Sequence, residues 1–381
     1  MVPRTLTLPR SPKRSFFLWG PRQVGKTSLL EMTYPHTPLI SLLLNEELTQ
    51  LRARPGRLRE RLKESKAKFI LIDEVQKVPE LLDEIHYLIE KERVVFGLCG
   101  SSARKLKKSH ANLLGGRAVR YELLGLTSSE LGRDFSLERI LNRGALPAIY
   151  QDDNFRQLHK SYCTDYLKEE IFDEGLVRKL SPFSQFLEFA ALSDTEILSW
   201  ETFARDVGVS APTIRAYFEI LSDTLIGRFL PAYTRRPKRK TVAAPKFYFS
   251  DLSVVNYFAQ RGELKPRSEL FGKALENWVH HELRAYLLYR ERGESLSYWK
   301  IHQGPEVDFI IGLMKAAIEV KGAENIHGDH LKGLRELARD YPEVKRRYVV
   351  SLESHSRRTE DHITILSVAD FVKRLWSDEL F

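Results

Sequence analysis

The chain has 381 residues, of which 43% are hydrophobic and 29% charged, an ordinary balance for a globular protein of two or three domains. No segment approaches the roughly 18 to 20 consecutive apolar residues of a membrane-spanning helix, and the basic start lacks the apolar stretch of a signal peptide. The two cysteines, Cys99 and Cys163, are too few for a disulfide framework or a zinc site. We therefore expect a cytoplasmic protein with no membrane partner, and the net charge of +9 favours a polyanionic partner.

Residues 14 to about 125 alternate apolar strands with helices, which predicts an α/β domain with a parallel sheet and helices on both faces. The expected strands are residues 16–19, 39–44, 69–73, 94–98 and 118–123. Between the first strand and the first helix, GPRQVGKT fits the phosphate-binding pattern GxxxxGK[ST]. Backbone N–H groups, a helix dipole and a lysine bind phosphates there, and the threonine hydroxyl binds Mg²⁺. The expected ATP-binding residues are Gly20, Pro21, Arg22, Gln23, Val24, Gly25, Lys26, Thr27 and Ser28.

Two carboxylates follow the apolar run Lys68–Ile72, at the place where a P-loop ATPase needs them. Asp73 is expected to orient the Mg²⁺ that Thr27 binds, and Glu74 to activate the attacking water. An acidic pair after a strand is also common as a helix cap, but its combination with the P-loop favours the catalytic interpretation.

Two further residues are candidates for contact with the nucleotide. Ser101 follows the strand 94–98 and is expected to sense the γ-phosphate, with a plain helix cap as the alternative. Arg117 follows two glycines and is a candidate arginine finger that reaches the nucleotide of a neighbouring subunit, which would require a homo-oligomer.

These segments together resemble a prokaryotic AAA+-type ATPase family whose members join a P-loop domain to a C-terminal domain of unknown function. The resemblance rests on GPRQVGKT, on Asp73-Glu74 followed by Val75-Gln76, and on the segments CGSSARKL and LLGGR. It continues through Tyr248–Asp251, Glu306–Phe309 and Ile318–Lys321, and so covers nearly the whole chain. The chain departs from the family at Gly144–Ala148, where an acidic residue is usual, and in its short segment before the first strand.

The sequence predicts mainly helices from about residue 126 to residue 225. From about 126 to 190 no strand pattern appears, and the capping-box pattern at Leu126–Leu131 opens a stretch that would form the AAA+ lid. Residues 200–208 and 211–225, separated by a glycine turn, form a helix-turn-helix pattern, and two strands joined by a charged wing follow. This winged helix is expected to contact DNA, although such modules in ATPases also serve as packing or protein contacts. The expected DNA-binding residues are Thr213, Arg215, Arg235, Arg236, Lys238, Arg239 and Lys240.

The C-terminal segment contains a second cluster of charged residues. If Leu313-Met314 joins two strands, Asp308 lies opposite Glu319, and Lys321 faces the same side. This arrangement suits a metal-dependent phosphodiesterase in which Asp308 and Glu319 hold Mg²⁺, Lys321 orients the water and Glu276 is an auxiliary ligand. The set resembles the core of PD-(D/E)XK nucleases, with Val307-Asp308 in place of proline-aspartate. The alternatives are a degenerate DNA-binding platform and a buried ion pair.

The sequence therefore predicts four parts: a P-loop AAA+-like core (1–125), a helical lid (126–190), a winged helix (191–262) and a C-terminal α/β nuclease-like domain (263–381). The predicted function is ATP hydrolysis with Mg²⁺ that moves the protein on DNA or remodels DNA, with metal-dependent strand cleavage as an open addition. The alternative is an ATP-dependent regulatory switch that acts on a protein partner.

Overall fold

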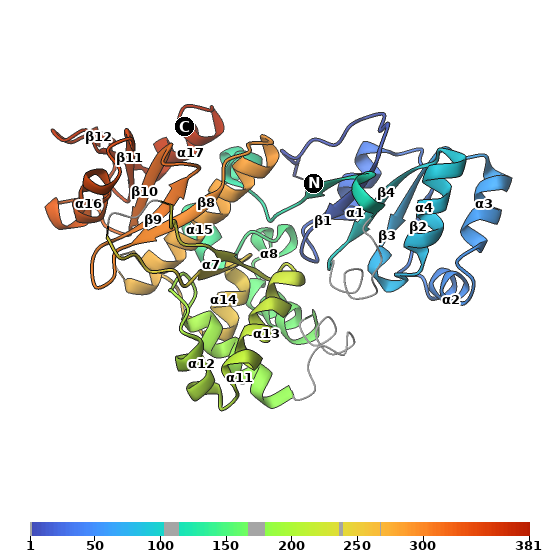
Figure 1. Ribbon diagram of the computed structural model, residues 1–381, viewed down its shortest axis with the longest axis horizontal. Coiled ribbons are helices and arrows are strands. Elements are labelled where there is room, and N and C mark those ends of the chain that lie inside the picture. Colours follow the sequence, from blue (N-terminus) through green and yellow to red (C-terminus); the bar gives the residue numbers. More distant parts are fainter. Residues whose placement is uncertain (1, 103–113, 167–179, 236–238, 267) are drawn as a thin grey trace.

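The N-terminal strands form a five-stranded parallel sheet in the order β2-β3-β4-β1-β5. The computed structural model describes all residues except 1, 103–113, 167–179, 236–238 and 267 (Figure 1). The strands are β1 (Ser15–Trp19), β2 (Leu39–Ser41), β3 (Phe69–Asp73), β4 (Val95–Gly100) and β5 (Ala118–Glu122). Every residue of β1 is buried, with Phe16 in one hydrophobic core and Phe17 in another. A sheet buried on both faces explains the continuous apolar runs, and the predicted α/β class is confirmed.

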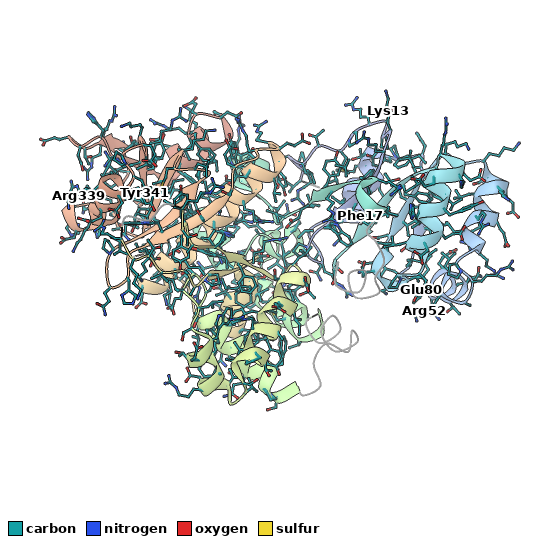
Figure 2. All side chains as sticks on the ribbon, viewed as in Figure 1. Lys13, Phe17, Arg52, Glu80, Arg339 and Tyr341 are labelled. Carbon is teal, nitrogen blue, oxygen red and sulfur yellow. The ribbon has the colours of Figure 1, made fainter. Side chains whose placement is uncertain are left out.

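Helices cover both faces of this sheet, which forms the right-hand lobe of Figure 1. They are α1 (Lys26–Thr33), α2 (Asn45–Ala53), α3 (Arg57–Ser65) and α4 (Leu81–Glu92), with short 3-10 turns at Val75–Lys77 and Leu114–Gly116. The buried residues of α4 recur at helical spacing, whereas Glu80 at its N-terminus is exposed; they are Leu81, Leu82, Ile85 and Leu88. Figure 2 shows the same contrast between Lys13 at the surface and Phe17 inside the sheet.

The central part of the chain is mostly helical. Its elements are α6 (Ser128–Leu131), a 3-10 turn (Gly132–Asp134), α7 (Leu137–Arg143), α8 (Pro147–Gln151), α9 (Phe155–Ser161), a π-helical turn (Tyr162–Tyr166), α11 (Leu180–Leu192), α12 (Trp200–Val207), α13 (Ala211–Asp223), β6 (Gly227–Leu230), β7 (Lys246–Phe249) and α14 (Leu252–Phe258). Gly208 ends α12 in the left-handed region and Ser210 caps α13. The structure thus contains the predicted pair of helices, followed by the antiparallel pair β6–β7.

The C-terminal part is built on a mixed six-stranded sheet in the order β12-β13-β11-β10-β9-β8. Its elements are α15 (Glu269–Tyr289), β8 (Leu296–Lys300), β9 (Glu306–Ile311), β10 (Ala316–Lys321), a 3-10 turn (Gly328–Leu331), α16 (Lys332–Asp340), β11 (Arg346–Ser351), β12 (Arg357–Arg358), β13 (Thr364–Ser367) and α17 (Val368–Trp376). The turn between β9 and β10 spans residues 312–315 rather than two residues. The pairing of Ala316 with Ile311 nevertheless gives the predicted register.

Helix α15 crosses the interior of the molecule between the C-terminal sheet and the central helices (Figure 1). Thirteen of its 21 residues are buried, including the polar side chains of Asn277, Glu282 and two histidines. Glu282 accepts hydrogen bonds from the backbone N–H of Ser128 at 2.8 Å and from the indole of Trp376 at 2.8 Å. No helix in the described part of the chain is both long enough and apolar enough to cross a membrane.

Gly144→Ala is expected to destabilise the protein by about 2 kcal/mol or more. Gly144 has φ +83°, and an added Cβ would lie 2.1 Å from Asp251 Oδ1. That carboxylate accepts from the backbone N–H groups of Ala145 and Ser253, so it is not free to move away. The free energy of unfolding in urea measures the effect. The matched control is Gly56→Ala, at φ −58° with no atom within 4 Å of the added Cβ; equal stability of the two variants would contradict the prediction.

Candidate functional site

The P-loop connects the end of β1 to the start of α1, as the pattern predicts. Gly25 has φ +91°, in the region that favours glycine, and a Cβ on Gly20 would lie 2.3 Å from the carbonyl oxygen of Leu123. The ammonium of Lys26 is buried and donates hydrogen bonds to the carbonyl oxygens of Gly20 and Pro21, each at 2.8 Å. A cationic group is therefore held against the loop that would bind phosphates.

The two residues expected to bind the same Mg²⁺ ion are in direct contact. The hydroxyl of Thr27 donates to Asp73 Oδ2 at 2.8 Å, from the start of α1 to the end of β3. A hydroxyl and a carboxylate side by side are oxygen ligands of the kind that Mg²⁺ prefers. With the Lys26 ammonium and the glycine-dependent loop, these residues fit a nucleoside triphosphate with its Mg²⁺.

Glu74 follows Asp73 directly and lies in a buried polar cluster. Its backbone has φ 56°, and its carboxylate accepts hydrogen bonds from the side-chain amide of Gln76 and, at 3.4 Å, from the hydroxyl of Ser101. The same Gln76 amide donates to Ser101 Oγ at 3.0 Å. The structure thus brings Glu74 and Ser101 together, and it adds Gln76, to which the sequence interpretation gave no role. The signal for Gln76 was its position two residues after Glu74.

Arg117 lies far from the P-loop of its own chain. In the pairing of β1 with β5, Ser15 lies beside Ala118 and Trp19 beside Glu122, so Arg117 and the P-loop are at opposite edges of the sheet. Its guanidinium forms an ion pair with Glu90. A role of Arg117 at the nucleotide of a neighbouring subunit stays a prediction.

Arg4 contacts the P-loop, although sequence reasoning gave residues 1–13 no role. Its guanidinium donates to the carbonyl oxygen of Val24 at 2.5 Å, to that of Leu124 at 2.6 Å and to Glu130 Oε1 at 3.1 Å. The side chain of Arg4 is only 5% exposed. One side chain therefore connects the P-loop to the segment after β5 and to helix α6, and no local sequence pattern reveals contacts over such separations.

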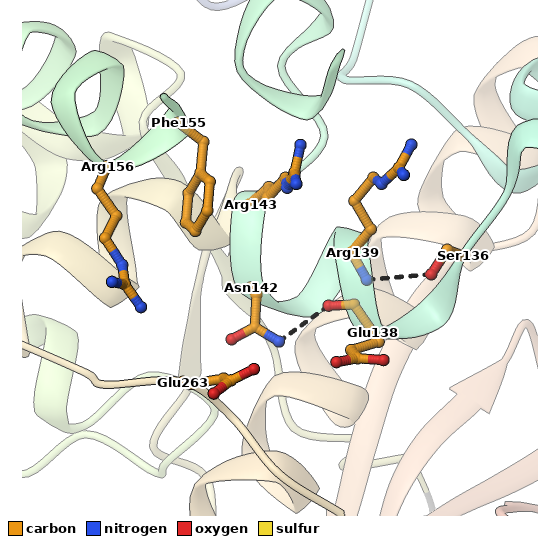
Figure 3. A pocket seen from close by; sticks show the side chains of 8 residues that line it. All are labelled: Ser136, Glu138, Arg139, Asn142, Arg143, Phe155, Arg156 and Glu263. Carbon is orange, nitrogen blue, oxygen red and sulfur yellow. Dashed lines mark hydrogen bonds between the residues drawn. The ribbon is translucent and has the colours of Figure 1, made fainter. Parts of the chain in front are cut away.

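An open pocket of about 430 Å³ lies among the central helices (Figure 3). Its lining residues are Ser136, Glu138, Arg139, Asn142, Arg143, Phe155, Arg156 and Glu263. Arg143 donates to the carbonyl oxygen of Asp152 at 2.9 Å and its guanidinium lies over the ring of Phe155. The pocket includes no residue of the P-loop and no residue of the C-terminal carboxylate cluster.

The residues expected to bind DNA do not share one environment. Arg215 is exposed on α13 with its guanidinium over the ring of Trp200, and Thr213 hydrogen-bonds to the helix cap Ser210. Arg235 and Lys240 are exposed, whereas Arg239 forms ion pairs with Glu336 and Asp340 of α16. Arg236 and Lys238 lie outside the described residues.

The connection between β6 and β7, residues 231–245, runs along the C-terminal sheet. Within its described residues, the N–H of Tyr233 donates to the carbonyl oxygen of Tyr298 on β8, and the N–H of Val242 donates to that of Lys300 at 3.0 Å. This connection was expected to be a wing directed toward DNA. A main-chain attachment to β8 is a long-range contact that charge patterning does not reveal.

The C-terminal carboxylates converge as expected, but with additional partners. Asp308 Oδ2 accepts from the backbone N–H of Val320 at 2.8 Å, and Lys321 forms an ion pair with Glu319 at 2.5 Å. Glu276 accepts from the hydroxyl of Tyr248 at 2.6 Å and from Lys246 at 2.9 Å. Lys246 and Tyr248 alternate along β7 and were not assigned to this site. Their period-two spacing on a strand was the available signal.

Burial and like charges govern the protonation of these groups. Burial, followed by the nearby Asp308, raises the pKa of Glu276 to about 7. The same two causes raise the pKa of Glu319 well above its usual range. Burial alone would lower the pKa of Lys246, but its acidic neighbours, Glu276 first, raise the pKa well above the ordinary value. The ammonium of Lys246 therefore stays charged beside these carboxyl groups.

Glu74→Gln is expected to retain nucleotide binding and to lower ATP turnover about 10²-fold or more, because an amide cannot accept a proton from water. Phosphate release measures turnover, and a fluorescent ATP analogue measures binding. Glu80→Gln makes the same change at the exposed start of α4 and should leave both quantities unchanged. Wild-type turnover in Glu74→Gln would rule out Glu74 as the base.

Comparison with known proteins divides the chain into three matched regions. Residues 12–132 match a family described as "AAA domain", and residues 134–265 and 271–371 match families described as "Domain of unknown function (DUF8612)" and "Domain of unknown function (DUF4143)". Uncharacterized proteins of Mycobacterium bovis and Mycobacterium tuberculosis are each 25% identical over 304 residues, which are 78% of this chain and 67% of the relative.

Among solved structures, that of the Aeropyrum pernix ORC1 protein in complex with DNA is 13% identical, with a TM-score of 0.29 over 66% of this chain and 87% of that chain. The match of residues 12–132 agrees with the P-loop and with the contact between Thr27 and Asp73. Residues 12–132 thus match an AAA domain over the stretch that contains the P-loop, Asp73 and Glu74.

Proposed function

We propose that the protein hydrolyses ATP with Mg²⁺ and uses the reaction to move on or remodel DNA. The observation that carries the ATPase part is the hydrogen bond between Thr27 and Asp73, which joins the P-loop to the last residue of β3, directly before Glu74. ATP with Mg²⁺ would supply the reactive phosphate and a cation that offsets its charge. The chain's own residues would bind, orient and move protons.

Each residue of the nucleotide site would have a separate role. Lys26 would bind the phosphates, and Thr27 and Asp73 would hold the metal ion. Glu74 would accept the proton of the attacking water, in an orientation fixed by Gln76 and Ser101. Arg117 would act on the nucleotide of a second copy, since its own P-loop is at the other edge of the sheet.

Exposed cations support DNA as the partner. Arg215 on α13 and Arg235 and Lys240 beside β6–β7 are exposed, and the chain carries a net charge of +9. Arg239 contributes less to this proposal because Glu336 and Asp340 bind its guanidinium. Strand cleavage is not part of the proposal, because the C-terminal carboxylates are held by lysines.

An ATP-dependent switch that acts on a protein partner is the second candidate. The observation in its favour is the attachment of the β6–β7 connection to β8, together with the ion pairs of Arg239 to α16. In this candidate the basic connection serves packing inside the chain, and DNA plays no part.

DNA is expected to stimulate ATP turnover in the DNA-remodelling candidate, and Lys26→Ala should abolish turnover with or without DNA. Turnover is measured without DNA, with a duplex and with a four-way junction, while a gel follows binding. Replacement of Arg215, Arg235 and Lys240 by alanine should weaken DNA binding and lower its salt-dependence slope by about 0.9 for each phosphate that the protein no longer neutralises.

A control that removes the same charge at Lys13, Arg52 and Lys63, which are exposed on the ATPase domain, should keep both the stimulation and the slope. Turnover that depends on Lys26 but ignores DNA, with no gel shift, would support the switch. An inactive wild type that also fails to bind ATP would overturn both candidates.

A further inference from the structure

The C-terminal carboxylate cluster already contains a cation. The ammonium of Lys246 lies 2.9 Å from Glu276 Oε1 and 3.6 Å from Asp308 Oδ1, and it forms a further ion pair with Glu306. Its side chain is 3% exposed, and the ammonium also lies 5.6 Å from the centre of the Tyr298 ring. Lys246 thus occupies the space between the carboxylates where sequence reasoning expected a metal ion.

As they are arranged, these residues do not fit a divalent metal. Within the described residues, no group of three or more histidine, cysteine, aspartate and glutamate side chains is placed to hold one. Lys321 binds Glu319 at 2.5 Å, and Lys300 binds Glu306 at 3.0 Å. The cluster is therefore a network of carboxylates and ammonium groups whose charges nearly balance.

We propose that Lys246 is a built-in cation that takes the place of a divalent metal in the C-terminal domain. While its ammonium lies between Glu276 and Asp308, the cluster binds no Mg²⁺ or Mn²⁺. Withdrawal of that ammonium converts the same carboxylates into a site for a divalent cation.

The groups that remain without Lys246 are suited to such an ion. Glu276, Asp308 and Glu319 supply carboxylate oxygens, the ligand type that Mg²⁺ and Mn²⁺ prefer. In the described structure, Glu319 Oε2 is buried and has no hydrogen-bond partner, so one oxygen of the cluster is already available. Without Lys246, Glu276 and Asp308 lose the ammonium that they share, and a divalent cation would offset the charge left between them.

Strand pairing places Lys246, which lies opposite Leu230 of β6. Lys246 is the first residue of β7, and the N–H of Val242, four residues earlier, donates to the carbonyl oxygen of Lys300 on β8. Arg239, earlier in the same connection, is bound to α16.

Lys246→Met tests the proposal, because methionine has a similar length and no charge. Mn²⁺ binding to the full chain without nucleotide is measured by the loss of the free-ion signal in electron paramagnetic resonance. We expect Lys246→Met to bind Mn²⁺ roughly tenfold or more tightly than the wild type, and Lys246→Met combined with Asp308→Asn to lose this gain. Binding at the P-loop is common to all these proteins and is subtracted.

The matched control is Lys315→Met. Lys315 lies in the turn between β9 and β10, is more exposed than Lys246 and forms an ion pair with Glu294. This variant should leave Mn²⁺ binding at the wild-type level. A cooperatively folded Lys246→Met protein without added Mn²⁺ binding would overturn the proposal. If that variant fails to fold, Asp308→Asn alone decides: Mn²⁺ binding by the wild type that Asp308→Asn removes would overturn the proposal, and Mn²⁺ binding unchanged by Asp308→Asn would support it.

Discussion

The burial of polar side chains on α15 is the constraint on which the arrangement of the whole molecule depends. A buried carboxylate or amide needs hydrogen-bond partners, and the helix itself cannot supply them. Asn277 donates to Asp194, Glu282 accepts from Ser128, and Arg284 forms an ion pair with Glu122 at the end of β5. Partners from three separate regions must therefore meet the same helix, and this fixes where those regions lie.

The nucleotide site is connected to this framework at the end of β5. The N–H of Leu123 donates to the carbonyl oxygen of Trp19, directly before the P-loop, and the N–H of Leu124 donates to the hydroxyl of Tyr289 at the end of α15. Glu122 is bound by Arg228 of β6 as well as by Arg284. A displacement of residues 122–124 on nucleotide binding would therefore change the contacts of this segment with both β6 and α15, without any change inside the sheet.

The parts that sequence reasoning predicted well are those fixed by local chemistry. The P-loop is contiguous, and Asp73 is the last residue of a strand whose carboxyl end must lie beside it in a parallel sheet. The opposition of Asp308 and Glu319 was also predictable, since a turn of two or of four residues with the same midpoint gives the same register. The parts that could not be predicted depend on distant partners. Arg4 and Glu130 are 126 residues apart in the sequence. In the sequence, Lys246 is one of several cations near the basic segment, and only the structure shows that it lies among carboxylates.

The contact of Asn277 with Asp194 bears on how the chain can be divided. The three regions matched by known families follow one another along the sequence, which suggests that each could be expressed as a separate fragment. A fragment that stops before α15 would contain Asp194 and Glu122 but none of the groups on that helix that neutralise or solvate them. Such a fragment would expose the apolar surface that α15 covers, and would be prone to aggregate. The boundaries between the matched regions are thus boundaries of sequence similarity, and the contacts of α15 with Asp194 and Glu122 cross them.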